Sequence, residues 1–241
     1  MRITHKILSV GFAAVLGVMG FSPARAAEND TNDPMYRLAL GEVLSQTSVS
    51  FWDSTLRLGQ DFSYGFSNRF SAGINAHYQF DFDGDEDGFS NIDIGGNYRL
   101  SGASDNSSRI ISDLLFGLKF GGSSHVRTPE YADTIYYAGV RAGRQWAGLT
   151  LAATVKTSWI FDNDRGMAYI DLTPEAYFRI NPNWRLGGGF MFRKATRPHY
   201  DQEWIDFKVI RQYGRTQYLA HVDYEFESNE AQIGTRVNIL F

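Results

Sequence analysis

Hydrophobic and polar residues alternate along most of the chain after residue 55. Leu56, Leu58 and Phe62 fall on one side of this alternation, and small or polar residues fall on the other. Successive side chains of a β-strand point to opposite faces, so the pattern predicts strands with one apolar and one polar face. The runs 55–66 and 70–82 exceed the roughly five or six residues of a usual globular strand. They have the length of tilted strands that cross a membrane.

Further alternating runs follow to the last residue and bring the total to eleven. Beyond the first two, they cover 92–100, 110–120, 136–146, 149–161, 170–180, 184–192, 205–213, 218–226 and 232–241. Pro174 lies inside one of them, where it predicts a weak strand or a β-bulge, because proline cannot donate a ladder hydrogen bond.

Short and long connections alternate between these runs. The turns at 67–68, 147–148, 181–183 and 214–216 are short, whereas 82–90, 121–133 and 196–201 are longer and polar; only 101–108 breaks the order. Aromatic residues gather beside both kinds of connection: Phe66, Phe70, Trp146, Trp184, Tyr213 and Phe241 by the short turns, and Phe80, Phe82, Trp159, Phe161 and Phe226 by the long loops. Two aromatic girdles and unequal loops are typical of a transmembrane β-barrel.

The predicted fold is therefore all-β, a closed antiparallel transmembrane β-barrel. Bacterial single-chain barrels hold an even number of strands, so the eleven runs require one more, which we expect over 36–49. Twelve strands are the prediction, and ten are the alternative if two weak runs are loops. Tyr36, Leu38 and Leu40 would share one face of the first strand, but Met35 to Val49 could instead form a short plug-like segment.

The last ten residues resemble the C-terminal assembly signal of Gram-negative outer-membrane barrels. The residues that match its pattern are Gln232, Gly234, Val237, Ile239 and Phe241. The segment 64–70, Tyr-Gly-Phe-Ser-Asn-Arg-Phe, also resembles a Tyr-Gly-Leu-Thr-Asp-Arg-Leu turn of outer-membrane transporter barrels. The resemblance implies a porin-like barrel in the outer membrane of a Gram-negative bacterium. Its partners would be outer-membrane lipid, lipopolysaccharide and the barrel-assembly machinery.

The first 26 residues have the form of a cleaved signal peptide. Arg2 and Lys6 precede an apolar run over 7–21 and an Ala-Arg-Ala site that ends at residue 26. We expect 27–34 to be a disordered lead and 35–241 to be the barrel. Removing the signal peptide leaves 20 of the 23 basic residues against 27 acidic ones, a net charge of −7. This balance argues against nucleic acid as a partner, and the lack of cysteine excludes disulfides.

Charged residues of both signs fall on the predicted inward faces. The candidate lumen-lining residues are Arg99, Arg141, Lys156, Asp171, Glu175, Arg179, Arg185, Asp223, Glu225 and Arg236. Such charges can line a narrow water-filled pathway for small solutes, or they can pair across a plugged interior and stabilise it. The first interpretation predicts a channel or transporter whose solute the sequence does not reveal. The second predicts a structural or surface-interaction barrel.

The loop after residue 82 carries the first half of a calcium-loop pattern. Asp83, Asp85 and Asp87 stand at positions 1, 3 and 5, with Gly88 at position 6. Position 12, which should hold a bidentate acid, is Ile94. The residues therefore predict a weak calcium site, with a solvated acidic loop tip as the alternative.

An enzyme at the rim of the barrel is a third interpretation. His125 lies in one long loop, and His199 lies close to Asp201 in another. A dyad is conceivable there, but no serine follows a histidine at the spacing of the phospholipase-type barrels, so no catalytic residue is predicted. His77 and His221 should face the lumen as polar lining.

Overall fold

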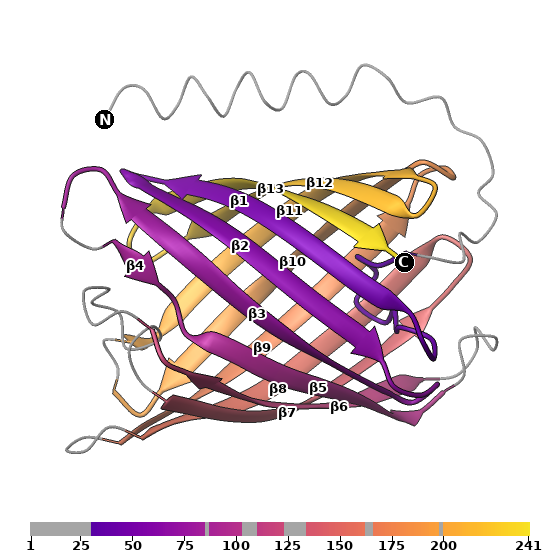
Figure 1. Cartoon of the computed structure of the whole chain (residues 1–241), viewed down its shortest axis with the longest axis horizontal. Coiled ribbons are helices and arrows are strands. Elements are labelled where there is room, and N and C mark those ends of the chain that lie inside the picture. Colours follow the sequence, from indigo (N-terminus) through magenta and orange to yellow (C-terminus); the bar gives the residue numbers. More distant parts are fainter. Residues whose placement is uncertain (1–29, 85–86, 103–109, 123–133, 162–165, 198–199) are drawn as a thin grey trace.

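A computed structural model describes residues 30–84, 87–102, 110–122, 134–161, 166–197 and 200–241. Its strands are β1 (Val43–Trp52), β2 (Thr55–Gly65), β3 (Phe70–Asp81), β4 (Gly88–Phe89), β5 (Ile92–Ser101), β6 (Ile111–Phe120), β7 (Thr134–Gln145), β8 (Leu149–Phe161), β9 (Met167–Arg179), β10 (Trp184–Ala195), β11 (Gln202–Tyr213), β12 (Thr216–Glu225) and β13 (Glu230–Leu240). Together they form one antiparallel barrel (Figure 1).

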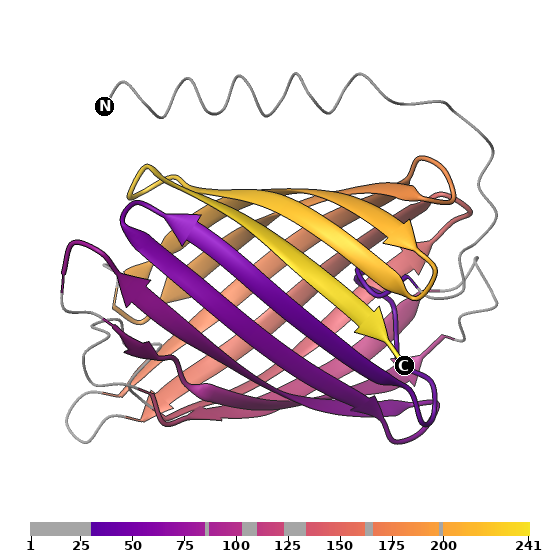
Figure 2. The same cartoon turned by 45° about the horizontal axis from the view of Figure 1, so that its top comes forward.

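Twelve long strands make the closed ring, and β4 is a two-residue addition beside β3. Each long strand pairs with its neighbours in the chain, and β1 pairs with β13 to close the ring. At that closure the amide of Phe241 donates to the carbonyl of Val43 at 2.8 Å. Figure 2 shows β1 and β13 side by side along their whole length. The prediction of a twelve-stranded antiparallel barrel is confirmed.

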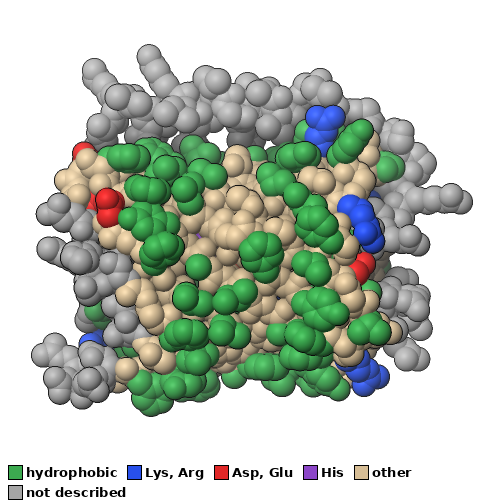
Figure 3. All heavy atoms as spheres, viewed as in Figure 1, with side chains coloured by type: hydrophobic (Ala, Val, Ile, Leu, Met, Phe, Trp, Pro, Cys, Tyr) green, Lys and Arg blue, Asp and Glu red, His purple; other side chains and the backbone are tan. Residues whose placement is uncertain are grey.

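The barrel is apolar outside and polar inside. Large hydrophobic side chains such as Phe62, Ile170 and Phe178 are about half exposed on the outer face, and Figure 3 shows hydrophobic side chains spread over this surface. Exposure of this apolar surface to water would be unfavourable, whereas lipid can cover it. The closed barrel also leaves no unpaired strand edge in the lipid. No helix in the described part of the chain has the length and apolar character needed to cross a membrane.

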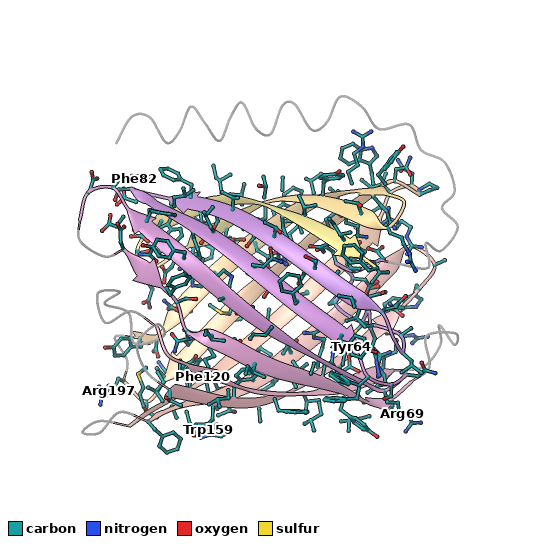
Figure 4. All side chains as sticks on the ribbon, in the orientation of Figure 1. Tyr64, Arg69, Phe82, Phe120, Trp159 and Arg197 are labelled. Atoms are coloured by element: carbon teal, nitrogen blue, oxygen red, sulfur yellow. The ribbon has the colours of Figure 1, made fainter. Side chains whose placement is uncertain are left out.

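The two ends of the barrel differ, and we call them the short-turn end and the long-loop end. Tyr64 and Arg69 lie at the short-turn end, whereas Phe82, Trp159 and Arg197 lie at the long-loop end (Figure 4). The rings of Tyr64 and Phe66 meet edge to face at the first end, and those of Tyr136 and Phe161 do so at the second. Aromatic residues thus mark both ends, as the sequence predicts.

Pro174 does not break the strand that contains it. β9 continues through it, and Pro174 is paired with Ala153 of β8. On the β10 side the ladder lacks pairs opposite Thr173 and Pro174, but its register is the same before and after the gap. The missing N–H therefore costs local pairing and produces no bulge.

The start of the chain differs from the expectation. The first strand begins at Val43 and ends at Trp52, so Tyr36, Leu38 and Leu40 lie before it. Residues 30–34, expected in a disordered lead, are ordered against the barrel interior, because polar side chains of the barrel bind them. Residues 27–29 and the expected signal peptide lie outside the described residues.

Candidate functional site

All ten candidate lumen residues lie on inward faces, opposite the exposed apolar side chains of their strands. They fall into two groups along the barrel. Arg99, Arg141, Arg179 and Arg185 lie near the short-turn end, and the other six lie nearer the middle or the long-loop end. Their contribution to solute passage stays a prediction.

The charged side chains of the middle lumen form contacts along the wall. Asp171 of β9 accepts from Arg193 Nε of β10 at 2.7 Å, and Lys156 Nζ of β8 lies 3.4 Å from the same carboxylate. Lys208 Nζ lies 2.9 Å from Asp206 of its own strand and 3.5 Å from Glu175. These pairs join the same or nearby strands. The side chains of Lys156 and Lys208 remain 30% exposed, so solvent reaches the charges in this part of the lumen.

Three inward rings of the middle lumen lie against glycines of neighbouring strands. The Tyr137 hydroxyl occupies the space where a Cβ on Gly95 or Gly117 would stand, and it donates to Asp93 at 3.1 Å. The His221 ring covers Gly234 in the same way, and its Nδ1 lies 2.8 Å from Asp223. The third ring, that of His77, lies over Gly59. A side chain at any of these glycines would displace the ring from the wall, so the glycines keep three large groups out of the lumen centre.

The short-turn mouth is occupied by residues Asp30–Ala39, which we call the N-terminal plug (the indigo segment inside the barrel in Figures 1 and 2). Asp30 is only 4% exposed. Its Oδ2 accepts from Arg185 Nε at 2.8 Å and lies 3.5 Å from Arg179 Nη2. Its Oδ1 accepts from Gln217 Nε2 at 2.9 Å and from the hydroxyl of Tyr177. Asp30 is therefore held by β9, β10 and β12 together.

Further polar contacts of the plug continue round the mouth. Arg99 Nη2 donates to the carbonyl of Met35 at 2.9 Å, and Arg141 Nη1 donates to that of Pro34 at 2.6 Å. Thr150 Oγ1 donates to Asp33 Oδ2 at 2.6 Å. On the opposite side, Thr31 contacts Gln217 and Asn238 through its hydroxyl. The plug thus binds strands from β5 to β13, and two arginines bind its backbone carbonyls directly.

Apolar side chains complete the seating of the plug. Met35 is 2% exposed and packs with Ile111 and Ala152, whereas Leu38 packs with Leu44 and Leu240. Gly41 then reverses the chain into β1 with a left-handed φ of 84°, a conformation that glycine adopts without strain. Burial is the main cause that raises the pKa of Asp33, and the nearby charge of Asp30 acts in the same direction.

Burial therefore differs sharply between the two parts of the lumen. The side chains of Arg185 and Asp113 at the plug are 0% exposed, against the 30% of the mid-lumen lysines. Asp113 accepts from Arg99 Nε at 2.5 Å beneath Met35. Full burial of charged side chains is thus found at the plug, and the mid-lumen lysines remain partly exposed, although Asp171 beside Lys156 is only 4% exposed.

The long-loop end holds the candidate calcium loop. Asp87 Oδ1 accepts from the backbone amide of Asp81, and the amide of Asp83 donates to Asp81 Oδ1 at 3.2 Å. Asp85 lies outside the described residues, as do His125 and His199 of the rim-enzyme interpretation. Across the described ranges, no three His, Cys, Asp or Glu side chains gather as a metal site. Calcium binding stays a prediction.

The other candidate residues have clear places in the fold. Glu225 accepts from Ser228 Oγ at 2.8 Å near the long-loop end, and Arg236 lies on the inward face of β13. Of the five assembly-signal residues, Val237, Ile239 and Phe241 face outward. Gln232 and Gly234 are paired opposite Trp52 and Ser50 of β1. Their recognition by assembly machinery stays a prediction.

Sequence reasoning missed the residues that hold the plug, above all Asp30, Tyr177 and Gln217. Tyr177 occupies an inward position of a predicted strand, and Gln217 directly precedes the run predicted over 218–226, so the alternation gave their orientation. Their partner was not, because Asp30 belongs to a stretch without strand periodicity. The contacts of Asp30 join residues 147 to 187 positions apart.

Comparisons with known proteins identify similar folds but no sequence family. No protein-family model matches the chain, and no curated protein matches its sequence. Among solved structures, the porin NanC has a TM-score of 0.61 at 8% identity and covers 83% of this chain and 98% of its own. The porin KdgM, solved with disordered oligogalacturonate, has a TM-score of 0.60 at 12% identity. The match covers 82% of this chain and 98% of the KdgM chain. An outer-membrane channel from Pseudomonas putida F1 has a TM-score of 0.61 at 10% identity. The match covers 89% of this chain and 100% of the channel's chain. The chain therefore has the fold of outer-membrane porins and channels.

Proposed function

We propose that this barrel is a narrow outer-membrane channel for small polar solutes, and that the N-terminal plug closes its short-turn mouth. The contrast between the partly exposed Lys156 and Lys208 of the middle lumen and the fully buried Arg185 at the mouth carries the proposal. The mid-lumen ion pairs named above run along the wall, and the three rings lie against glycines of the wall. A lumen that served only as a packed core would need no such clearance.

The outer surface and the comparisons support the same proposal. An apolar outer face bounded by aromatic residues suits a barrel that spans a bilayer. The three similar structures are named porins or a channel, which favours transport over catalysis for this fold. The expected surroundings are outer-membrane lipid and lipopolysaccharide, with the barrel-assembly machinery as the partner during insertion.

The competing proposal is a structural barrel with a permanently closed lumen. The plug favours it, because polar and apolar contacts anchor the segment on many strands. The two proposals differ in one measurable respect. A channel conducts ions once the plug is removed, whereas a structural barrel stays closed because its middle is also blocked.

Single-channel recording in planar lipid bilayers tests the proposal. The full chain is compared with a variant lacking residues 30–38, which leaves every strand intact. We expect rare or small conductance steps from the full chain and long, uniform openings from the deletion variant. Circular dichroism and resistance to protease confirm that the deletion variant is folded. A folded deletion variant that conducts no better than the full chain would establish the structural barrel instead.

A further inference from the structure

Asp30 occupies a cup of hydrogen-bond donors on the inner wall of the mouth. The cup consists of Arg179, Arg185, Tyr177 and Gln217, contributed by β9, β10 and β12. These are guanidinium, hydroxyl and amide groups, which suit an oxyanion. Both oxygens of the Asp30 carboxylate are bound, so this side chain acts as an anionic ligand supplied by the chain itself.

The cup has more donor capacity than one carboxylate uses. Arg185 is fully buried, yet its Nη2 has no hydrogen-bond partner among the described residues, and the same holds for Arg179 Nε. A planar guanidinium can form two parallel bonds to one anion. An anion with a third or fourth oxygen could therefore engage donors that Asp30 leaves unused.

The charge of the cup also requires an occupant. Arg179 and Arg185 are paired directly across β9 and β10, so two like charges stand side by side. A buried cation without a counter-ion is strongly unfavourable. Asp30 should therefore leave the cup only when water or another anion takes its place.

Of the groups in this site, Asp30 is the one on an element that can move. The plug contributes no strand to the barrel and is attached through side-chain contacts and carbonyls bound by arginines. The cup residues, in contrast, lie on or beside paired strands. Exchange of the ligand therefore means movement of the plug and not deformation of the barrel.

We propose that the Arg179–Arg185 cup is an anion-binding site, and that solutes bearing a carboxylate or phosphate group displace Asp30 and release the plug. The inference rests on the proposed channel, because it names the chemical class of solute that opens the mouth. Binding at the cup and movement of the plug can nevertheless be measured without any conductance.

Thiol labelling can follow the plug directly, because the chain has no cysteine of its own. Met35→Cys places a thiol at a position that is 2% exposed while the plug is seated. The full chain in detergent is treated with a maleimide in sodium chloride, sodium acetate or sodium phosphate of equal ionic strength and pH. We expect labelling to be about tenfold faster in phosphate than in chloride, with acetate between them. Glu227→Cys, on the exposed turn between β12 and β13, should label at one rate in all three salts.

Two cup variants connect the effect to the site. Arg179→Gln in the Met35→Cys background should remove the phosphate acceleration, whereas Arg179→Lys should retain part of it because the charge remains. Should Arg179→Gln fail to fold, Tyr177→Phe removes one donor of Asp30 and should alter the phosphate response. Arg185 is unsuitable for this test because it is completely buried.

Equal labelling rates in the three salts would refute the anion site. So would an acceleration that persists unchanged in Arg179→Gln, since it would arise elsewhere than in the cup. Failure of the channel proposal gives a different result, because the deletion variant then remains non-conducting whatever the labelling rates. The two experiments therefore separate an error about the anion from an error about the channel.

Discussion

Asp30→Asn is the most direct perturbation of the mouth. It keeps the size and shape of the side chain, removes its charge and replaces one acceptor oxygen with an amide donor. Arg185 Nε, 2.8 Å from the carboxylate, and Arg179 Nη2, at 3.5 Å, then lose their counter-ion. The variant therefore destabilises the seated plug and leaves the strands unchanged.

The size of the effect follows from the burial of the pair. Removing one partner of a buried ion pair costs about 3–5 kcal/mol. The lower value is appropriate here, because water enters the mouth and hydrates Arg179 and Arg185 when the plug leaves. About 3 kcal/mol changes an equilibrium by roughly two orders of magnitude, at 1.36 kcal/mol per tenfold. A plug that is unseated about 0.1% of the time would then be unseated about 10% of the time.

Single-channel recording measures this change as the fraction of time in the open state. Asp33→Asn is the matched control, since it makes the same chemical change three residues away in the same plug. Asp33 bonds to Thr150 and to the amide of Met35 and forms no ion pair with an arginine among the described residues. We expect it to shift the equilibrium by about 1 kcal/mol or less.

The comparison of the two variants tests whether the ion pair between Asp30 and Arg185 holds the plug in the mouth. If Asp30→Asn opens the channel no more often than Asp33→Asn, the ion pair with Arg185 does not hold the plug. The same conclusion follows if both variants open as often as the barrel without residues 30–38, because any disturbance of the segment would then be sufficient.

Three further outcomes can be measured. Phe241→Ser should lower the amount of barrel in the outer membrane several-fold, by immunoblot of membrane fractions, whereas Thr235→Ala on the same outward face should not; equal levels would contradict the assembly signal. Gly95→Ala should push the Tyr137 ring off the wall and reduce the conductance of the plug-free barrel, and adding Tyr137→Ala should restore it; an unchanged conductance would show that the ring does not border the pathway. Because burial raises the pKa of Asp33 in the seated plug, that state binds more protons, so its extra stability is present at low pH and is lost as pH rises through the raised pKa. Open probability should accordingly fall as the pH is lowered from neutrality toward the ordinary aspartate pKa of 3.8, less steeply in Asp33→Asn; an equal slope would exclude Asp33.

Local pattern was sufficient for the barrel wall. Each strand has a two-residue repeat, and lipid and lumen demand opposite side chains, so the alternation reports both the strand and the direction of each residue. This is why Arg99, Lys156 and Arg236 could be placed on inward faces without a structure. The strand count also followed, because an even number of strands was needed to close the ring.

The tertiary structure alone decided what fills the lumen. Residues 30–35 have no strand period, and the alternation of Tyr36, Leu38 and Leu40 resembles a strand that begins in fact only at Val43. Their place depends on partners that only barrel closure brings together, such as Arg185, which is 155 positions from Asp30. The position of Tyr137 has the same origin, since its hydroxyl reaches the wall only because Gly95 and Gly117 come beside it across two strand pairings. Alternation specifies which way a side chain points, but closure of the barrel determines what it meets there.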